Sequence, residues 1–462
     1  MGGEIIVKIS ELLGSKVLVI GAGVTGKAVA RELEKFGAAV TVTDENLSSS
    51  AGDSISTDEA LTQQWSFAVV SPGWRIDHPF LEKMRKKGLR LMSEVDLAWD
   101  LKCEIRPSQK WIGITGTNGK TTTVELASAM LKAGGLKVTA CGNVGDTVIE
   151  AVCSGLSFDW LVVELSSFQL EWSQTPHFHS VAILNVADDH TDWHGNFKNY
   201  MSAKLKILDR ADEAIVNADD GGLVVATQSW HGKKTYFTLN SPKPGELGLV
   251  ENLLIDRAFV ADAEEASVIA ELLDVSPSAP HSVSNTFAAA GLALSAGVSH
   301  DDIRTAVKNF SPGRHRIETV LESDGITWID DSKATNPHAA QASLMSQTSV
   351  VWIAGGLAKG ANMSELVAKT KNRIKVAILI GTDREMIAKE LMEQGPEIKI
   401  IRVDGTQTDS LMERVVKIAQ VEAKSGDCVL LAPACASMDQ FISYADRGDQ
   451  FVQAVRSLVG QS

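Results

Sequence analysis

The sequence lacks the features that mark several classes of protein. Its 462 residues include only five cysteines, and none of them forms a CxxC pair, so we expect reduced thiols in a cytoplasmic protein. No apolar run approaches the ~20 residues that span a bilayer. The first residues, MGGEIIVKIS, lack the basic segment and the long apolar core of a signal peptide. We therefore expect neither a membrane span nor a secretory leader.

Basic side chains are in the minority. The chain has 44 lysines and arginines against 58 acidic residues, for a formal charge of −14. This balance argues against a surface that binds nucleic acid, because affinity for phosphates needs a cationic face. It does not exclude a local pocket that binds an anion. Hydrophobic residues make up 44% and charged residues 22%, as in soluble globular proteins. At about 150 residues per domain, the length corresponds to roughly three domains.

Short apolar runs alternate with longer helical patterns along most of the chain. This alternation predicts an α/β fold with mainly parallel sheets. A helix is expected at 24–36, between the first two strands. The expected strands lie at 16–20, 39–43, 67–70, 111–114, 137–140, 159–164, 180–185, 213–217, 326–330, 350–354, 376–380, 398–402 and 428–432.

Breaks in this pattern suggest where linkers and turns lie. Residues 103–109 contain Pro107 and have little periodicity, so we place the first linker there. The SPG at 311–313 precedes a new strand pattern and marks the second linker. Residues 241–248, SPKPGELG, are predicted to form a surface turn inside the second block.

A glycine motif, GAGVTG, follows the first expected strand at 21–26, and Asp44 ends the next strand. This arrangement matches GxGxxG, in which glycines let the backbone approach a pyrophosphate at a helix N-terminus. A tight strand–helix turn without a ligand is the alternative. We favour nucleotide or diphosphate binding over a turn without a ligand. The motif gives much less support to nicotinamide as the specific ligand.

A second glycine motif, TGTNGKTT at 115–122, lies between an apolar strand and a helical pattern. Such a loop directs backbone N–H groups at phosphates, while Lys120 adds positive charge and Thr121 can ligate Mg²⁺. The strict GxxxxGK pattern fails because position 114 is Ile. The GxxGKT variant nevertheless predicts a phosphate loop rather than a turn with an incidental lysine.

Polar residues follow other strands of the same block. Glu164 ends the run DWLVVE, and Asp188, Asp189 and His190 follow SVAILN. A carboxylate at the carboxyl end of a parallel strand lies where such sheets bind ligands, and its hard oxygen donors suit Mg²⁺. A solvated strand end is the alternative for Glu164. Lys204, in the helical stretch NYMSAKLKIL, is by itself typical of a solvated helix lysine.

The third block carries three polar segments at strand ends. They are DDSKATNP at 330–337, GGLAKG at 355–360 and LAPACASMDQF at 431–441. Lysines in such loops are well placed to hold anions, and Pro337 fits the first helical position after an Asn336 cap. Cys435 is predicted to be a packed thiol, because no base is adjacent to it in the sequence.

Taken together, the motifs resemble those of the Mur ligases, in the same order and over essentially the whole chain. The motifs GVTG, SPG (71–73), DDSKATN and SMDQF favour the member of that family that adds D-glutamate over those that add L-alanine, diamino acids or dipeptides. The other motifs that carry the resemblance are TGTNGKTT, GNVG (142–145), VVELSSFQLE, NVADDHTDWHG, YMSAKLKIL, NADD (217–220), SNTFAAA, GRHRIE, GGLAKG and APACASMDQF.

The resemblance implies three domains and an ATP-dependent amide ligase. The domains are an N-terminal Rossmann-like domain at 1–106 for a UDP substrate, a central P-loop ATPase domain with a mainly parallel sheet at 107–312, and a C-terminal Rossmann-like domain at 313–462 for D-glutamate. The implied substrates are ATP, UDP-MurNAc-L-Ala and D-glutamate, with two Mg²⁺ ions as cofactors. The resemblance also implies a carbamylated Lys204, and we expect a monomer.

Site residues carry over from the family by position. The implied catalytic and metal residues are Lys120, Thr121, Glu164, His190 and Lys204. The implied ATP contacts are Gly116, Thr117, Asn118, Gly119, Lys120, Thr121, Thr122, Asn285, Arg316 and Asp331. The implied UDP-substrate contacts are Val24, Thr25, Gly26, Asp44, Ser71, Pro72, Gly73, Asn143 and Gln169. The implied D-glutamate contacts are Lys333, Thr335, Lys359, Ser437, Met438 and Tyr444.

Two positions depart from the family pattern. Tyr444 stands where some relatives have Phe, and residues 45–48 (ENLS) differ around the expected uracil site. Alternatives to the D-glutamate ligase are a Mur ligase with another acceptor, a nicotinamide oxidoreductase built on the first glycine motif, and a phosphate-loop switch protein. The oxidoreductase leaves TGTNGKTT without a role, and the switch protein leaves DDSKATNP without one.

Overall fold

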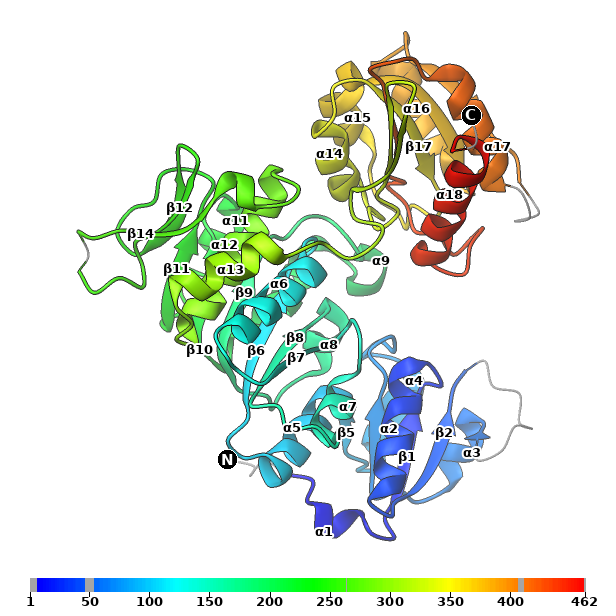
Figure 1. The fold of residues 1–462 in the computed structure, drawn as a ribbon. Coiled ribbons are helices and arrows are strands. Elements are labelled where there is room, and N and C mark those ends of the chain that lie inside the picture. Colours follow the sequence, from blue (N-terminus) through cyan, green and yellow to red (C-terminus); the bar gives the residue numbers. More distant parts are fainter. Residues whose placement is uncertain (1–5, 46–53, 263, 406–410, 461–462) are drawn as a thin grey trace. The chain divides into compact units, whose positions relative to one another are not determined.

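The computed structural model describes residues 6–45, 54–262, 264–405 and 411–460 (Figure 1). Three mostly parallel sheets with helices on their faces confirm the predicted α/β class. The chain forms two compact units. The first unit comprises the described residues of Met1–Val186 and Lys198–Phe310, and the second comprises those of Ala187–Phe197 and Ser311–Ser462.

The N-terminal sheet, blue in Figure 1, has the strand order β3-β2-β1-β4-β5 and parallel pairing in its described part. The continuous runs VLVI and FAVV form its central strands because both faces of these strands are buried. The strands are β1 Lys16–Ile20, β2 Ala39–Thr43, β3 Ser54–Ile55, β4 Phe67–Val70 and β5 Leu91–Ser93, and the helices are α1 Ile9–Leu12, α2 Val24–Lys35, α3 Thr57–Thr62, α4 Pro79–Lys86 and α5 Glu94–Ile105.

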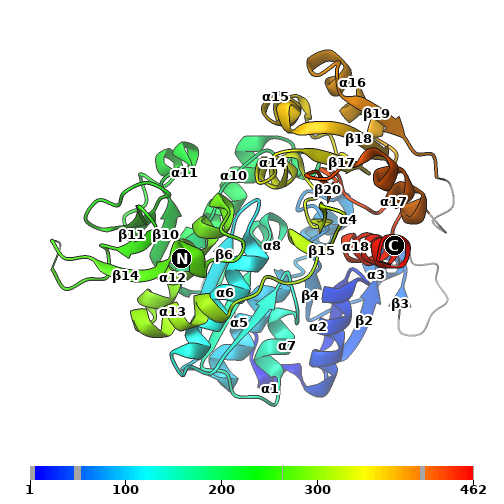
Figure 2. The ribbon, with the colours of Figure 1, turned by 45° about the horizontal axis from the view of Figure 1, so that its top comes forward.

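The central sheet has the order β14-β13-β12-β11-β10-β9-β6-β8-β7, with antiparallel pairing only along β12, β13 and β14 among the described strands. Helices α6, α12 and α13 pack together beside it (Figures 1 and 2). The strands are β6 Lys110–Thr115, β7 Val138–Gly142, β8 Trp160–Glu164, β9 Phe178–Ile183, β10 Ala211–Asn217, β11 Lys233–Phe237, β12 Glu246–Val250, β13 Leu253–Asp256 and β14 Ser267–Glu271. The helices are α6 Lys120–Ala133, α7 Val148–Cys153, α8 Ser167–Trp172, α10 Phe197–Leu205, α11 Gly221–Ala226, α12 Pro280–Ser295 and α13 His300–Asn309, with 3₁₀ turns at Lys206–Leu208 and Leu272–Asp274.

The sheet of the second unit has the order β15-β16-β20-β17-β18-β19 and is parallel except for β15 within the described residues. Its strands are β15 Glu318–Ser323, β16 Ile326–Asp330, β17 Val350–Gly355, β18 Ile374–Ile380, β19 Lys399–Arg402 and β20 Cys428–Leu431. Its helices are α9 Thr191–His194, α14 Pro337–Met345, α15 Ser364–Thr370, α16 Arg384–Gln394, α17 Leu411–Glu422 and α18 Tyr444–Leu458, with a 3₁₀ turn at Lys371–Arg373.

The hydrophobic cores explain the division into units. In the first unit, one cluster contains both Val17 of the N-terminal sheet and Trp111 of the central sheet, so the two sheets share a core. In the second unit, successive side chains of β17 alternate between two clusters. Trp352 packs in one cluster with α14, α15 and α16, and Ile353 packs in the other with α17 and α18. This alternation is what a strand with both faces covered requires.

The structure corrects several details of the sequence prediction. Residues 241–245 form the expected turn, but strand β12 begins at Glu246. Helix α5 continues to Ile105, into the stretch predicted as the first linker. The capping residue Asn336 and Pro337 at the first helical position of α14 are confirmed. Strands β3, β5, β11, β12, β13, β14 and β15 were not predicted, because they are short or mix polar with apolar residues.

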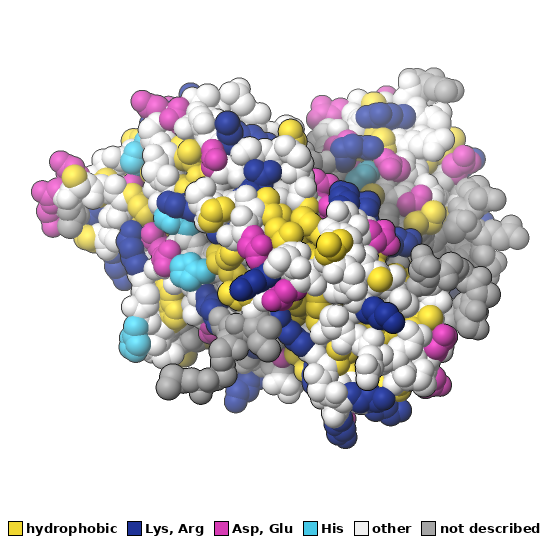
Figure 3. Space-filling view, turned by 90° about the horizontal axis from the view of Figure 1, so that it is seen from below, with side chains coloured by type: hydrophobic (Ala, Val, Ile, Leu, Met, Phe, Trp, Pro, Cys, Tyr) yellow, Lys and Arg dark blue, Asp and Glu magenta, His cyan; other side chains and the backbone are white. Residues whose placement is uncertain are grey.

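The surface is of mixed charge on the face shown in Figure 3, where acidic and basic side chains are interspersed. Among the described residues, no helix is both long and apolar enough to cross a membrane. The described cysteines are all free thiols. Cys435 is fully buried, as predicted for a packed thiol, and burial raises the pKa of its thiol to about 12.

Candidate active site

The phosphate loop lies between β6 and α6 in the first unit. Strand β6 ends at Thr115 and helix α6 begins at Lys120, so the glycine turn opens directly onto a helix N-terminus, which attracts anions. Gly119 has φ = +84°, and a Cβ at this position would lie 2.3 Å from Oδ1 of Asn285. The loop therefore requires glycine here, both for its backbone angle and for the close approach of α12.

Two lysine side chains meet at one carbonyl oxygen of this loop. The Nζ of Lys120 donates to the carbonyl oxygens of Gly116 and Thr117, both at 2.9 Å. The Nζ of Lys204 donates to the same Gly116 oxygen at 2.8 Å, and Lys204 is only 2% exposed. Phosphate oxygens are stronger acceptors than carbonyls for an ammonium. Both side chains therefore lie directly beside the loop, and the Lys120 ammonium is placed to bind an anionic ligand there.

Two residues that the sequence analysis did not single out hold the loop in place. Asn185, just after β9, accepts from the backbone N–H of Asn118 at 2.8 Å and donates to its carbonyl at 3.1 Å. The hydroxyls of Tyr200 and Thr117 lie 3.0 Å apart and share a hydrogen bond. Both residues lie inside quoted motifs, NVADDH and YMSAKL, but only their contacts reveal this supporting role.

Glu164 lies at the end of β8, as predicted, and is 1% exposed. Its Oε1 accepts from the side-chain amide of Asn143 at 2.9 Å. Its Oε2 is buried and has no hydrogen-bond partner among the described residues. A buried carboxylate oxygen without a donor is costly, and a divalent cation would compensate it. The donor set around Glu164 therefore fits a hard metal ion such as Mg²⁺.

The first glycine motif is built as a close strand–helix turn. A Cβ on Gly21 would lie 2.4 Å from Oγ of Ser71, and a Cβ on Gly26 would lie 1.8 Å from the Gly21 carbonyl oxygen. Asp44 Oδ2 accepts from the N–H of Ala22 at 2.8 Å, so this carboxylate braces the loop itself. The hydroxyl of Ser71 is buried without a described partner. The turn thus combines a tight backbone with one unsatisfied hydroxyl.

Other residues predicted to contact the UDP substrate also belong to the first unit. Gln169 uses its side-chain oxygen to cap α8, accepting from the Ser166 N–H and hydroxyl at 2.9 Å each. Val24 is 78% exposed at the start of α2. Residues 45–48 differ from the family pattern around the expected uracil site, and residues 46–48 of this segment lie outside the part of the chain that the structure describes.

His190 belongs to the second unit, whereas Thr121, Glu164 and Lys204 belong to the first. It has φ = +51° and caps α9, and its Nε2 lies 3.6 Å from Oδ2 of Asp189. The predicted metal set is therefore divided between the two units. A role for His190 beside the other three residues stays a prediction.

The predicted D-glutamate residues lie on loops at the carboxyl ends of neighbouring strands. Strands β16, β20 and β17 are adjacent, so the loops that follow them meet at one edge of the sheet. Leu357 and Ala436 pair across two of these loops through reciprocal backbone hydrogen bonds of 2.9 Å. The Lys333 Nζ donates to the Tyr444 hydroxyl at 2.9 Å and lies 4.2 Å from the centre of its ring. Ser437 is buried and Met438 is exposed.

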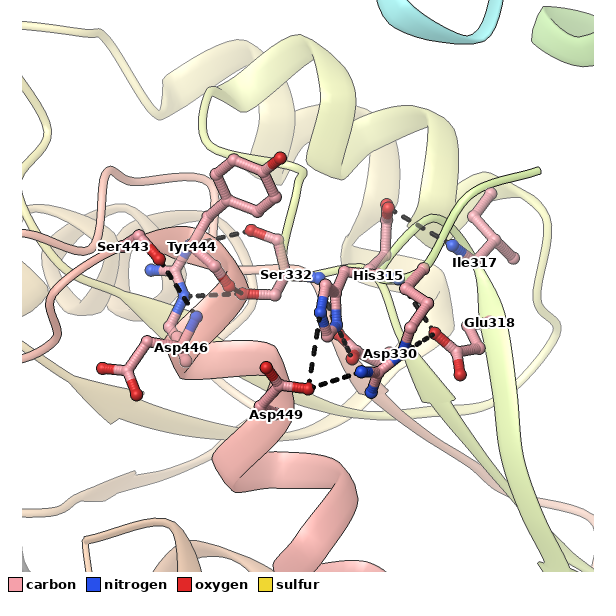
Figure 4. A network of polar contacts seen from close by, with 12 residues as sticks. His315, Ile317, Glu318, Asp330, Ser332, Ser443, Tyr444, Asp446 and Asp449 are labelled. Carbon is pink, nitrogen blue, oxygen red and sulfur yellow. Dashed lines mark hydrogen bonds and ion pairs between the residues drawn. The ribbon is translucent and has the colours of Figure 1, made fainter. Parts of the chain in front are cut away.

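A network of polar contacts, in which His315 and Asp330 are buried and Asp449 is exposed, lies beside these loops (Figure 4). The His315 Nδ1 lies 2.6 Å from Oδ2 of Asp330, and this hydrogen bond raises the pKa of the imidazole. Asp331 accepts from the Ser343 hydroxyl and from the N–H of Ile317, and burial raises the pKa of its carboxyl to about 7.

A second set of possible metal ligands occurs in this network. His315, Glu318 and Asp330 lie close enough to share an ion. However, the His315 ring already bonds to Asp330, and its backbone N–H donates to Glu318 Oε2 at 2.9 Å. The groups satisfy one another, so this cluster needs no ion to explain it.

Comparison with known proteins places this site in a family. Residues 114–293 match the Mur ligase middle domain, and residues 315–435 match the Mur ligase glutamate ligase domain. A UDP-N-acetylmuramoylalanine--D-glutamate ligase of Thermobifida fusca is 45% identical, over 97% of this chain and 100% of that protein. One of Streptomyces coelicolor is 43% identical, over 97% of this chain and 99% of that protein. The chain belongs to the Mur ligase family.

Solved structures of Mur ligases share the fold at low sequence identity. A pseudomurein peptide ligase type C from Methanothermus fervidus has a TM-score of 0.62 at 18% identity, covering 97% of this chain and 100% of that one. The MurF ligase from Thermotoga maritima in complex with ADP has a TM-score of 0.60 at 16% identity, covering 98% and 97%. These neighbours support the three-sheet α/β architecture of this Mur ligase.

The two family regions divide the candidate residues of this Mur ligase. The phosphate loop, Glu164 and Lys204 lie in the middle-domain region, and Lys333 and Lys359 lie in the glutamate ligase region. The loop after β20 and the start of α18 extend beyond the second match. Ser437, Met438 and Tyr444 lie there.

Proposed function

We propose that this Mur ligase joins D-glutamate to UDP-N-acetylmuramoyl-L-alanine, with hydrolysis of ATP to ADP and phosphate, in peptidoglycan synthesis. The observation that carries the proposal is the identity of 45% with a ligase of that name over nearly the full length of both chains. A phosphate loop in which the Lys120 ammonium donates to two loop carbonyls supports the use of ATP. Lysines in the loops of the second unit suit a dianionic acceptor.

The proposed reaction has two steps. The carboxylate of the muramoyl substrate attacks the ATP γ-phosphorus, which forms an acyl phosphate and releases ADP. The amine of D-glutamate then attacks the acyl carbon, and phosphate leaves from the tetrahedral intermediate as the amide forms. Both steps build negative charge, so positioned cations and N–H donors lower the barriers. Lys120 and the N-terminus of α6 supply this charge stabilisation at the phosphates.

Magnesium completes the proposed phosphate site. When bound, Mg²⁺ would neutralise charge on the phosphates and so favour the transfer of the phosphoryl group. Two ions are proposed, with Thr121, Glu164, Lys204 and His190 as the residues that would hold them. The unsatisfied Oε2 of Glu164 supports this assignment for the first unit.

Carbamylation of Lys204 is part of the proposal. A bare ammonium beside Mg²⁺ would be repelled, whereas a carbamate offers hard oxygen donors. The neutral amine attacks CO₂, a nitrogen–carbon bond forms, and one proton is released.

¹³C NMR with labelled bicarbonate should give a carbamate resonance that is absent from Lys204→Ala. Formate or acetate, but not chloride at equal ionic strength, should partly restore activity to that variant. Full activity of Lys204→Ala without added carboxylate would exclude the role.

The domain limits 1–106, 107–312 and 313–462 belong to the proposal as well, as do a monomeric state and a cytoplasmic location.

A phosphate-release assay tests the function directly. Release should require ATP, Mg²⁺, UDP-MurNAc-L-Ala and D-glutamate together. L-alanine, a diamino acid or D-alanyl-D-alanine in place of D-glutamate should give background release only. Release that prefers one of these acceptors would make the protein a different ligase of the family.

A further inference from the structure

Arg447 is a buried cation with an unusual set of partners. It lies in the first turn of α18 and is 0% exposed. Its guanidinium donates to the Ser332 hydroxyl from Nε at 2.9 Å, to the Ser332 carbonyl from Nη2 at 2.9 Å and to the Cys435 carbonyl from Nη1 at 3.2 Å. Within the described ranges, it forms no ion pair with a carboxylate.

These acceptors lie on the two loops that carry the predicted acceptor site. Ser332 directly precedes Lys333 in the loop after β16, and Cys435 precedes Ser437 in the loop after β20. The Ser332 hydroxyl in turn donates to the Tyr444 carbonyl at 2.7 Å (Figure 4). One planar guanidinium thus fixes both loops against the start of α18. Arginine suits this task because its donors form a rigid fork.

The charge of Arg447 has a consequence for ligands. Burial lowers the pKa of its guanidinium to about 10, which still leaves it protonated at neutral pH. The carboxylates of Asp330 and Asp439 act in the opposite direction and raise this pKa, although neither forms a hydrogen bond with the guanidinium among the described residues. Desolvation of the buried guanidinium is still unfavourable, and a neutral side chain would avoid this cost. An anion bound nearby recovers part of the cost, because a buried charge is poorly screened.

We propose that Arg447 is a positioning residue for the amino-acid acceptor, which holds the loops of Lys333 and Ser437 in their binding geometry. This inference rests on the proposed function and names a residue of the same site. Arg447 acts on this site through Ser332 and Cys435. Its loss should therefore weaken use of D-glutamate selectively.

Steady-state kinetics of Arg447→Met and Arg447→Lys test the inference. Losing hydrogen bonds from a charged group should raise KM for D-glutamate about 10–100-fold in Arg447→Met. KM for ATP and for the UDP substrate should change by less than about threefold. Arg447→Lys keeps the positive charge but lacks the forked guanidinium. Its KM for D-glutamate should therefore lie between those of the wild type and Arg447→Met. Methylguanidinium should lower KM for D-glutamate in Arg447→Met, whereas sodium at equal ionic strength should not. Arg456→Gln, an exposed change on the same helix, is the matched control.

The possible outcomes separate the inference from the function on which it rests. A wild-type enzyme that does not ligate D-glutamate overturns both. If the wild type is active but KM for ATP rises as much as KM for D-glutamate in the Arg447 variants, only the inference is overturned. If the Arg447 variants do not fold, Ser332→Ala decides, because it removes the hydroxyl that links Arg447 to Tyr444. An unchanged KM for D-glutamate in a folded Ser332→Ala enzyme would then contradict the proposal.

Discussion

At the scale of single residues, substitution of Lys120 tests whether the loop between β6 and α6 binds the phosphates of ATP. Its ammonium donates to two carbonyls of the loop, and an ATP phosphate would offer a stronger acceptor. Lys120→Ala should reduce turnover by about 10²–10³-fold, the usual effect of removing one group that stabilises developing charge. Binding of the UDP substrate, measured by calorimetry, should stay nearly unchanged. Lys132→Ala, an exposed change at the end of the same helix, is the control. Near-normal turnover of folded Lys120→Ala would exclude the role.

Gly119 tests the backbone of the same loop. Alanine there must adopt φ = +84° and place a Cβ 2.3 Å from Oδ1 of Asn285. We expect Gly119→Ala to lower the free energy of unfolding by about 1–3 kcal/mol and to weaken ATP binding. Gly135 has φ = +78° but nothing within 4 Å of a Cβ, so Gly135→Ala measures the backbone cost alone. Denaturant unfolding of both variants gives the comparison. Equal losses would mean that the Asn285 contact adds nothing.

At the scale of elements, the N-terminus of α7 is capped from another helix. The Glu94 carboxylate of α5 accepts from the N–H of Ile149 at 2.7 Å. Burial raises the pKa of this carboxyl to about 7. Between pH 4.5 and 7 the folded state then holds the proton that the unfolded state has lost. Protein stability contributed by Glu94 therefore falls as the pH rises through this window.

Glu94→Gln should remove this pH dependence. Glutamine keeps the acceptor oxygen without the buried charge, so the variant should be more stable than the wild type above pH 7, by about 1–3 kcal/mol. The difference should shrink as the pH falls toward 4. Denaturant unfolding at several pH values measures it, with exposed Glu34→Gln on α2 as control. A constant difference across this range would contradict a titrating Glu94.

At the scale of the whole molecule, the second unit has its own cores on both faces of its sheet. A segment that buries both faces of a sheet internally can fold without the rest of the chain. We expect residues 311–462, expressed alone, to unfold in one cooperative transition, with a free energy of about 5–15 kcal/mol. Circular dichroism in urea checks this. A non-cooperative loss of signal would show that the segment depends on the first unit.

Much of the fold was predictable because buried parallel strands leave a simple pattern. FAVV, DWLVVE and VVWIA are nearly uniform apolar runs, and each forms a strand. The short β3 and the mixed strands β12 and β15 have no such pattern, since their side chains are only partly buried. Their places come from pairing with neighbours, which a local stretch of sequence does not encode.

The sequence by itself determined the class of fold, the two glycine turns and the family, because strand–glycine–helix punctuation and motif order are local properties of the chain. Only the tertiary structure decided which polar groups meet. Arg447 and Ser332 are 115 residues apart, and Lys204 and Gly116 are 88 apart. The unsatisfied Oε2 of Glu164 is likewise defined by what surrounds it in space. Hydrogen bonds and burial depend on packing between distant segments, and packing is settled only when the sheets and helices assemble.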